Sequence, residues 1–381
     1  MNAGVNAREL GAVRPYAKLP RMSWSVNIGR IAGIRLELHV TFLLFVAWIA
    51  LSQGVVSGDP VRALATTVLV LLVFTCVVLH ELGHALAARR YGIRTRDIVL
   101  LPIGGIARLE RMPDRPQQEI VVAVAGPAVN LVITLFLAGL MVALQRPITT
   151  SGMRDGLLES LLGINVLMVL FNMIPAFPMD GGRVLRAALA LRLPYLRATR
   201  IASTIGQTFA LAFGVIGFFY NPMLMFVALF VFLAAAEERA LVQTRASLSG
   251  LPARAAMITD YEALESTDPL QRAVDLLMAG SQQDFPVVEG GHPVGVLTRA
   301  DLIMALQRAG AQTPAGQVVR RSGHTAEAGE PLEQVFQRMR EHRHTALPVV
   351  SGNRMVGLLT LENVSELLLV QDALKRHAAQ G

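Results

Sequence analysis

Six apolar runs between residues 39 and 236 constrain the fold of this chain more than any other feature. They cover residues 39–51, 63–79, 120–144, 157–174, 201–220 and 223–236. A simple helical span needs about 20 apolar residues, so the third and fifth runs suffice alone, and the first and sixth need their flanks. Charged residues make up only 17% of the chain, against about 25% in a typical soluble domain. We therefore expect a polytopic α-helical membrane protein with about six transmembrane helices.

Basic residues are unevenly distributed between these runs. They gather before the first run, between the second and third, and between the fourth and fifth, whereas the other connections hold few. Loops rich in lysine and arginine stay on the cytoplasmic side, so we expect a multi-pass protein of the cell inner membrane with both termini in the cytoplasm. Residues 1–38 form a cytoplasmic arm and contain no apolar segment of the kind found in a cleavable signal. The arginines punctuate apolar runs instead of forming one soluble basic face, so no nucleic-acid partner is expected.

The chain changes character after the sixth run and contains an internal repeat. The membrane part covers residues 39–245, and a linker with glycine and proline occupies 246–254. Two similar segments, 255–309 and 316–370, follow the linker. Equivalent residues of the two segments align: Pro286 with Pro348, Gly295 with Gly357 and Thr298 with Thr360. In each segment a helical stretch precedes two short β-branched runs and a second helix, so we expect a soluble α/β domain built from two equivalent repeats.

The string His80-Glu-Leu-Gly-His84, at the end of the second apolar run, is the most informative one in the chain. Positions i and i+4 of a helix lie on one face, so the two imidazoles can bind one metal ion while Glu81 accepts a proton from a water on that ion. Two imidazoles and a carboxylate suit zinc with an open fourth position, and the pattern is typical of metal-assisted peptide hydrolysis. A charged residue at mid-bilayer costs about 2.5–3.5 kcal/mol, which favours a metal site over a merely structural polar cluster.

The fourth run supplies the third expected ligand. The second and fourth runs cross the membrane in the same direction, so the segment Asn172–Arg183 reaches the depth of the histidines and brings Asp180 with it. Pro175 and Pro178 break the helix there, an arrangement tolerated at membrane depth only where the backbone is buried in protein or lines a cavity. Four other carboxylates lie in an arginine-rich connection and are expected to be solvated or paired with arginine: Asp97, Glu110, Asp114 and Glu119.

These two segments, in this order, resemble the paired motifs of the site-2 protease family of intramembrane zinc metalloproteases. The strings Ala125–Asn130 and Leu101–Arg108 also resemble features of that family. The resemblance implies that His80, His84 and Asp180 bind one catalytic Zn²⁺ and that Glu81 is the base. It further implies that Asn172 lies near the substrate carbonyl.

Several other residues leave alternatives open. Asn130 hydrogen-bonds either within the catalytic pocket or in a polar contact between helices. Gly104 and Gly105 mark either a re-entrant hairpin whose free edge pairs with a substrate strand or a plain cytoplasmic loop. His342 and His344 lie in the soluble repeat, where no second metal site is expected.

The expected activity is intramembrane zinc proteolysis of another membrane protein. Cleavage in or beside a transmembrane segment, near its cytoplasmic side, releases a cytoplasmic fragment, which the resemblance connects with regulated intramembrane proteolysis. The substrate is then a single-span protein, such as an anti-sigma factor or another membrane-tethered regulator. Two alternatives remain open: a transporter or channel gated by the C-terminal repeats, with His80, Glu81 and His84 as its ion path, and a catalytically inactive scaffold.

The repeated C-terminal segment resembles a pair of cystathionine-β-synthase (CBS) domains. The resemblance implies an adenine nucleotide in the cleft between the repeats, with the ribose held by an aspartate that follows a strand-terminal Ser or Thr by three residues. Thr298 and Asp301 meet this pattern, whereas Thr360 is followed by Asn363, which weakens the second half. We expect one nucleotide site of modest affinity and a homodimer formed through the pair; the alternative is a pair that only dimerises or shields the cytoplasmic face.

Overall fold

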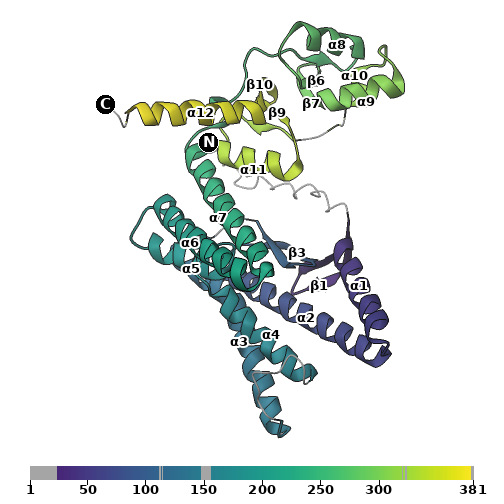
Figure 1. Ribbon diagram of the computed structural model, residues 1–381. Helices are drawn as coiled ribbons and strands as arrows, with labels where there is room; N and C mark the ends of the chain where they lie inside the picture. The colour runs from purple at the N-terminus through teal and green to yellow at the C-terminus, as the bar shows by residue number, and fades with distance from the viewer. Residues whose placement is uncertain are drawn as a thin grey trace, which may run out of the picture. The chain divides into compact units, whose positions relative to one another are not determined.

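The computed structural model describes residues 24–110, 113, 115–146, 156–319, 321 and 324–378 (Figure 1). The described chain divides into two compact units, the first ending at Val242 and the second beginning at Gln243. Each unit has its own secondary structure and its own hydrophobic cores.

Seven helices form most of the described first unit, and each expected apolar run corresponds to one of them, extending at most two residues beyond the helix. They are α1 (Val40–Ser57), α2 (Pro60–Arg90), α3 (Pro116–Ala143), α4 (Leu157–Asn172), α5 (Asp180–Ala190), α6 (Tyr195–Tyr220) and α7 (Pro222–Leu248), the last of which continues into the second unit. Within the described ranges, α2, α3 and α6 are long and apolar enough to cross a membrane, while α4 and residues 40–55 of α1 are shorter apolar helices. The membrane character is confirmed, but the expected number of six spans is not. In α7 the apolar stretch ends at Glu237, which shortens the part that could lie in lipid.

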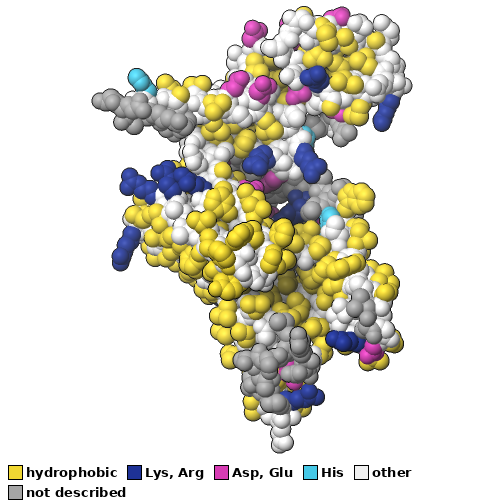
Figure 2. Space-filling view, viewed as in Figure 1, with side chains coloured by type: hydrophobic (Ala, Val, Ile, Leu, Met, Phe, Trp, Pro, Cys, Tyr) yellow, Lys and Arg dark blue, Asp and Glu magenta, His cyan; other side chains and the backbone are white. Residues whose placement is uncertain are grey.

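The apolar helices expose much of their hydrophobic surface. Figure 2 shows hydrophobic side chains gathered over α6 and α7, where Phe218, Phe219 and Phe226 are each about two-thirds exposed (69%, 72% and 67%). Contiguous apolar surface on this scale is unfavourable in water and is typical of a lipid-facing or interaction surface. The structure is therefore that of a membrane protein.

The first unit contains a four-stranded sheet, of which the sequence suggested only a hairpin at Gly104 and Gly105, as one of two alternatives. The strands are β1 (Ser25–Ile31), β2 (Ile34–His39), β3 (Thr95–Leu101) and β4 (Gly104–Leu109), in the order β1-β2-β3-β4. β2 and β3 are parallel, and the two outer pairs are antiparallel hairpins. Residues 25–38, expected to belong to a cytoplasmic arm, thus form strands that are hydrogen-bonded into the sheet.

The sheet packs against α2. Ile34 and Leu36 of β2, and Ile98 and Leu100 of β3, share a buried cluster with Val78 and Ala85 of that helix. Figure 1 shows β1 and β3 beside α1 and α2. This packing holds β4, at the end of the sheet, against the part of α2 that carries the candidate metal ligands.

The second unit confirms the internal repeat. Its first half contains β5 (Leu264–Glu265), α8 (Leu270–Ala279), β6 (Phe285–Glu289), β7 (His292–Leu297), α9 (Arg299–Ala309) and α10 (Ala315–Val318). Its second half contains β8 (Ala326–Glu327), α11 (Leu332–His342), β9 (Ala346–Ser351), β10 (Arg354–Thr360) and α12 (Leu361–Ala378). A short 3₁₀ helix, Ala253–Ala255, precedes both halves. Each half has a three-stranded sheet in which the middle strand pairs parallel with the two-residue strand and antiparallel with the third.

Candidate metal centre

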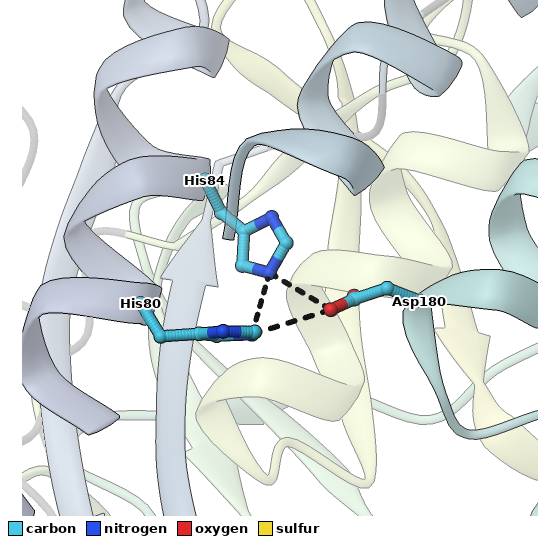
Figure 3. A group of neighbouring side chains, drawn as sticks. All are labelled: His80, His84 and Asp180. Atoms are coloured by element: carbon cyan, nitrogen blue, oxygen red, sulfur yellow. Dashed lines mark hydrogen bonds and ion pairs between the residues drawn. The ribbon is translucent and has the colours of Figure 1, made fainter. Parts of the chain in front are cut away.

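Three buried side chains from two helices converge in the first unit (Figure 3). His80 and His84 lie one turn apart on α2, and Asp180 is the first residue of α5. The Nε2 atoms of the two histidines are 3.1 Å apart, and the Oδ2 atom of Asp180 lies 3.2 Å from His80 Nε2 and 3.1 Å from His84 Nε2. Among the described residues, this is the group of His, Cys, Asp and Glu side chains whose ligand atoms all lie within 4.8 Å of one another.

The other ring nitrogen of each histidine is held by the protein. His80 Nδ1 donates to Asn130 Oδ1 of α3 at 2.6 Å, and His84 Nδ1 donates to the carbonyl oxygen of Val122 at 2.6 Å. A ring that donates from Nδ1 keeps the lone pair on Nε2, and second-shell bonds of this kind orient metal-binding histidines. Both lone pairs therefore face Asp180, so the donor set fits zinc, with two neutral nitrogens, a carboxylate oxygen and a fourth position open.

The metal centre depends on a glycine of α3. A Cβ atom on Gly126 would lie 2.7 Å from His80 Nε2 and closer still to His84 Nε2. Only the absence of a side chain at Gly126 lets α3 pass this close to both ring nitrogens. The same turn of α3 contains Pro127 and precedes Asn130, which hydrogen-bonds His80.

Glu81 lies beside His80 and faces the sheet. Its Oε2 accepts a hydrogen bond from the backbone N–H of Ala107 in β4 at 3.2 Å. A Cβ atom on Gly105 would lie 2.8 Å from Glu81 Cγ, so β4 can approach the carboxylate only because that position is a glycine. The geometry presents Glu81 next to the cluster without making it one of the three convergent groups.

Comparison with known proteins identifies the family. Residues 68–154 and 147–213 match the profile of peptidase family M50, and residues 253–308 and 315–370 each match that of the CBS domain. A zinc metalloprotease of Methanocaldococcus jannaschii is 35% identical over 277 residues, which cover 72% of this chain and 78% of that protein.

The chain belongs to peptidase family M50, the site-2 protease family. A solved site-2 protease from Methanocaldococcus jannaschii is similar at 38% identity, covering 57% of this chain and 95% of that one, with a TM-score of 0.42. Stage IV sporulation protein FB of Bacillus subtilis is 31% identical over 201 residues, which cover 52% of this chain and 64% of that protein. The resemblance drawn from the motifs is thereby confirmed, and the chain is a zinc metalloprotease with tandem CBS domains. Membership of this family favours hydrolysis over the transporter alternative.

The polar residues expected around the M50 site occupy different positions. Asn130 makes both kinds of contact considered for it, because it binds His80 on α2 and donates to Asn165 Oδ1 on α4 at 2.8 Å. Asn172 is the last residue of α4 and is half-buried; within the described chain, no hydrogen bond joins it to the two histidines or to Asp180. Asn165, fully buried, was not singled out from the sequence, where its one signal is an amide inside an apolar run.

The competing carboxylates are either paired with arginine or exposed where the structure describes them. Asp97 accepts from Arg108 Nε and Nη2 at 2.5 and 2.7 Å. Glu119 pairs with Arg186 at 2.5 Å. Glu110 is exposed, and Asp114 lies outside the described residues. None of the described ones belongs to the metal cluster.

Arg186 fixes the element that carries Asp180. It lies on α5, is completely buried, and pairs with Glu119 of α3 and with Glu238 of α7. Its guanidinium also lies over the rings of Phe177 and Tyr195, 5.0 and 5.1 Å from their centroids. Removing one partner of a buried ion pair leaves an uncompensated buried charge, which lowers the stability of the fold by about 3–5 kcal/mol. In the sequence, Arg186 is only one of several basic residues of an expected cytoplasmic connection.

Proposed function

We propose that this M50 protease hydrolyses peptide bonds in or near transmembrane segments of membrane-protein substrates. His80, His84 and Asp180 hold one Zn²⁺, and Glu81 is the catalytic base. The observation that carries the proposal is the convergence of three buried ligand atoms. Two are imidazole Nε2 atoms on the apolar helix α2, and the third is a carboxylate oxygen at the first residue of α5. Ionisable groups are rarely retained in such surroundings without coordination or catalysis.

Each residue around this site has its own role in the proposed reaction. His80, His84 and Asp180 would hold the Zn²⁺, which would supply Lewis-acid chemistry by polarising the scissile carbonyl and lowering the pKa of a water. Glu81 accepts the proton of the attacking water and passes it to the departing amine. Asn130 and the Val122 carbonyl keep both imidazoles in the tautomer that binds metal. Asn172 supports the substrate carbonyl by a hydrogen bond.

We propose that the substrate binds as an extended strand along the free edge of β4. β4 is the last strand of its sheet; Ile106 on this strand is 50% exposed, and Ile103 in the turn before it is 84% exposed. An extended segment can add to such an edge by backbone hydrogen bonds, and Ala107 of the same strand contacts Glu81. A single-span anti-sigma factor or another membrane-tethered regulator is the substrate class proposed, and its cleavage, as regulated intramembrane proteolysis, frees a cytoplasmic fragment.

Removal of the metal tests the proposed function. Purified protease in detergent micelles is expected to cleave a single-span substrate, to lose that activity when zinc is stripped with 1,10-phenanthroline, and to regain it when Zn²⁺ is restored. A non-chelating phenanthroline isomer serves as the control. Cleavage that persists after the zinc content has fallen to zero contradicts the proposed role of the metal.

We further propose six spans in the cell inner membrane with both termini in the cytoplasm, on the strength of the alternating basic connections. A reporter fused after Gly152 is expected to read as extracytoplasmic, and one fused after Gly250 as cytoplasmic. Gly152 lies outside the described residues, so the fusion avoids the described helices. A cytoplasmic reading at Gly152 excludes this arrangement.

The cleft of the CBS pair is the proposed nucleotide site. A cavity of about 880 Å³ lies between the two repeats and is lined by Thr298, Arg299, Thr360 and Asn363, among others; small-molecule sites occupy about 300–1,000 Å³. Thr298 caps α9 and donates to Asp301 Oδ2 at 2.8 Å. Thr360 makes the equivalent contact with Asn363 in the second repeat. Asp301 itself is not among the lining residues. We therefore propose that it contributes to nucleotide binding from behind Thr298, to which it is hydrogen-bonded.

The charge of the cleft favours a nucleotide with few phosphates. Its lining contains four carboxylates, Asp260, Asp284, Glu362 and Glu366, against one arginine. Burial raises the pKa of the Asp284 carboxyl, so this group takes up a proton at a higher pH than an exposed aspartate does. The repulsion of phosphate therefore weakens as the pH falls.

Calorimetry on the full protein should show AMP binding more tightly than ATP, and AMP binding should tighten as the pH is lowered from neutral. Asp301→Ala is expected to weaken AMP binding about 10-fold, equivalent to about 1.4 kcal/mol, while the exposed Asp275→Ala leaves it unchanged. If millimolar nucleotide produces no heat, the CBS pair does not bind nucleotide and only its role in dimerisation is left. The molecular mass of the protein in solution then tests whether it is a dimer.

A further inference from the structure

Three histidines gather in the second CBS repeat, and none of them lines the nucleotide cleft. His324 precedes β8, His342 is the last residue of α11, and His344 follows in the turn before β9. The ring centroids lie 4.9 Å apart for His324 and His342, 5.2 Å for His324 and His344, and 5.7 Å for His342 and His344. From the sequence, no metal site was expected at His342 and His344. His324 is distant from them along the chain, and only the fold brings it beside them.

A helix ending brings two of the rings onto the same side. Arg343, between them, has a φ of 55° and is the left-handed C-cap of α11. This reversal sets the rings of His342 and His344 within 11° of parallel. The third ring, from the segment before β8, lies against both.

The spacing of the three rings matches that of imidazoles on one metal ion. Zn–N distances of about 2.0–2.1 Å and tetrahedral angles place the centroids of bound imidazoles about 5 Å apart. The observed separations of 4.9–5.7 Å bracket that value closely. The nitrogens themselves do not yet converge as those of the first cluster do, so at least one ring must turn about its Cβ–Cγ bond, a torsion with a broad energy minimum in histidine.

The ring nitrogens are available for a metal. His342 Nδ1 donates to the carbonyl oxygen of Arg338 at 2.8 Å, which leaves the lone pair on Nε2, the arrangement seen in metal-binding histidines. His344 Nε2 is buried and has no hydrogen-bond partner in the described structure, although buried polar atoms are nearly always paired.

The local charge permits a cation. The positively charged Arg338 lies close enough to His324 and His344 to repel positive charge on either ring. Its guanidinium is paired with both carboxylate oxygens of Glu330, at 2.6 and 3.0 Å, so the carboxylate offsets much of its repulsion of an incoming ion.

We propose that His324, His342 and His344 form a second metal site, which takes Zn²⁺ or a similar divalent transition-metal ion with water as the fourth ligand. Imidazole ligands suit this class of ion, and the absence of a carboxylate makes the site weaker and more pH-dependent than the first cluster. The ion would tie the segment before β8 to the end of α11. Val335 and Met339 of α11 share a buried core with Leu248, the last residue of α7, so metal binding stiffens the domain at the point where the chain enters it.

Zinc analysis of five forms of the full-length protein tests the proposal separately from the catalytic centre. We expect two zinc ions per chain in the wild type, one in Asp180→Ala, one in His342→Ala, and none in the double variant. His292→Ala, which alters a histidine of the first repeat, should keep both. Because Asp180→Ala and His342→Ala remove different ions, failure of one site is distinguishable from failure of the other.

A ligand swap separates coordination from packing. His342→Cys retains a metal ligand, so it is expected to keep the second ion and, with Co²⁺, to show a sulfur-to-metal charge-transfer band that the wild type lacks. Circular dichroism checks that each variant is folded. The proposal is overturned if the wild type binds a single zinc that His342→Ala leaves in place, or if His342→Cys loses the second ion while folded.

Discussion

Glu81→Gln is expected to retain its zinc and to lose proteolysis. The two histidines and Asp180 converge without Glu81, whose carboxylate instead accepts from the Ala107 N–H. Glutamine preserves the shape of the side chain and cannot accept the proton of the attacking water. General-base catalysis is typically worth about 10²–10⁴-fold, so cleavage of a single-span substrate should fall by that factor, as measured by initial rates on samples of equal zinc content.

The matched control is Glu110→Gln, since Glu110 is an exposed glutamate that follows β4. It should leave both zinc content and rate unchanged. Undiminished cleavage by folded, zinc-loaded Glu81→Gln protein would remove Glu81 from the mechanism.

Gly126→Ala should abolish metal binding through a single methyl group. The added Cβ would lie 2.7 Å from His80 Nε2 and closer to His84 Nε2, directly at the two nitrogens that face the centre. Both rings or the backbone of α3 must then shift. A misplacement of about 1 Å can cost 10²-fold in rate, and we expect the loss of both zinc and activity to reach at least about that factor.

Gly139→Ala, on the same helix, separates this effect from any general change in α3. A Cβ at Gly139 meets nothing within 4 Å. Alanine favours helix over glycine by about 1 kcal/mol, so Gly139→Ala should not weaken α3, and only Gly126→Ala should lose zinc. Zinc retained in Gly126→Ala at wild-type stoichiometry would show that the ion is not held where these nitrogens converge.

The features that sequence predicted are those with a local signal. The apolar runs correspond to helices because each run alone carries the hydrophobicity that defines it. His80 and His84 share a helix face by spacing alone, and Asp180 could be paired with them through the shared direction of two helices.

The features that were missed depend on contacts between distant segments. β2 pairs in parallel with β3, more than fifty residues along the chain, and nothing in residues 25–38 signals such a partner. Arg186 has the residue type of a cytoplasmic anchor, and only the fold shows it buried against Glu119 and Glu238. Asn165 and His324 likewise gain their meaning from neighbours in space.

Mapping of new protein termini tests the central claim, intramembrane proteolysis at this centre, most directly. The wild type and Glu81→Gln are each co-expressed with a single-span membrane protein, and newly formed N-termini are identified by mass spectrometry. We expect termini within or beside the transmembrane segment, towards its cytoplasmic side, in the wild-type sample and none in the Glu81→Gln sample. The same termini in both samples, or termini confined to soluble regions of the substrate, would contradict the claim.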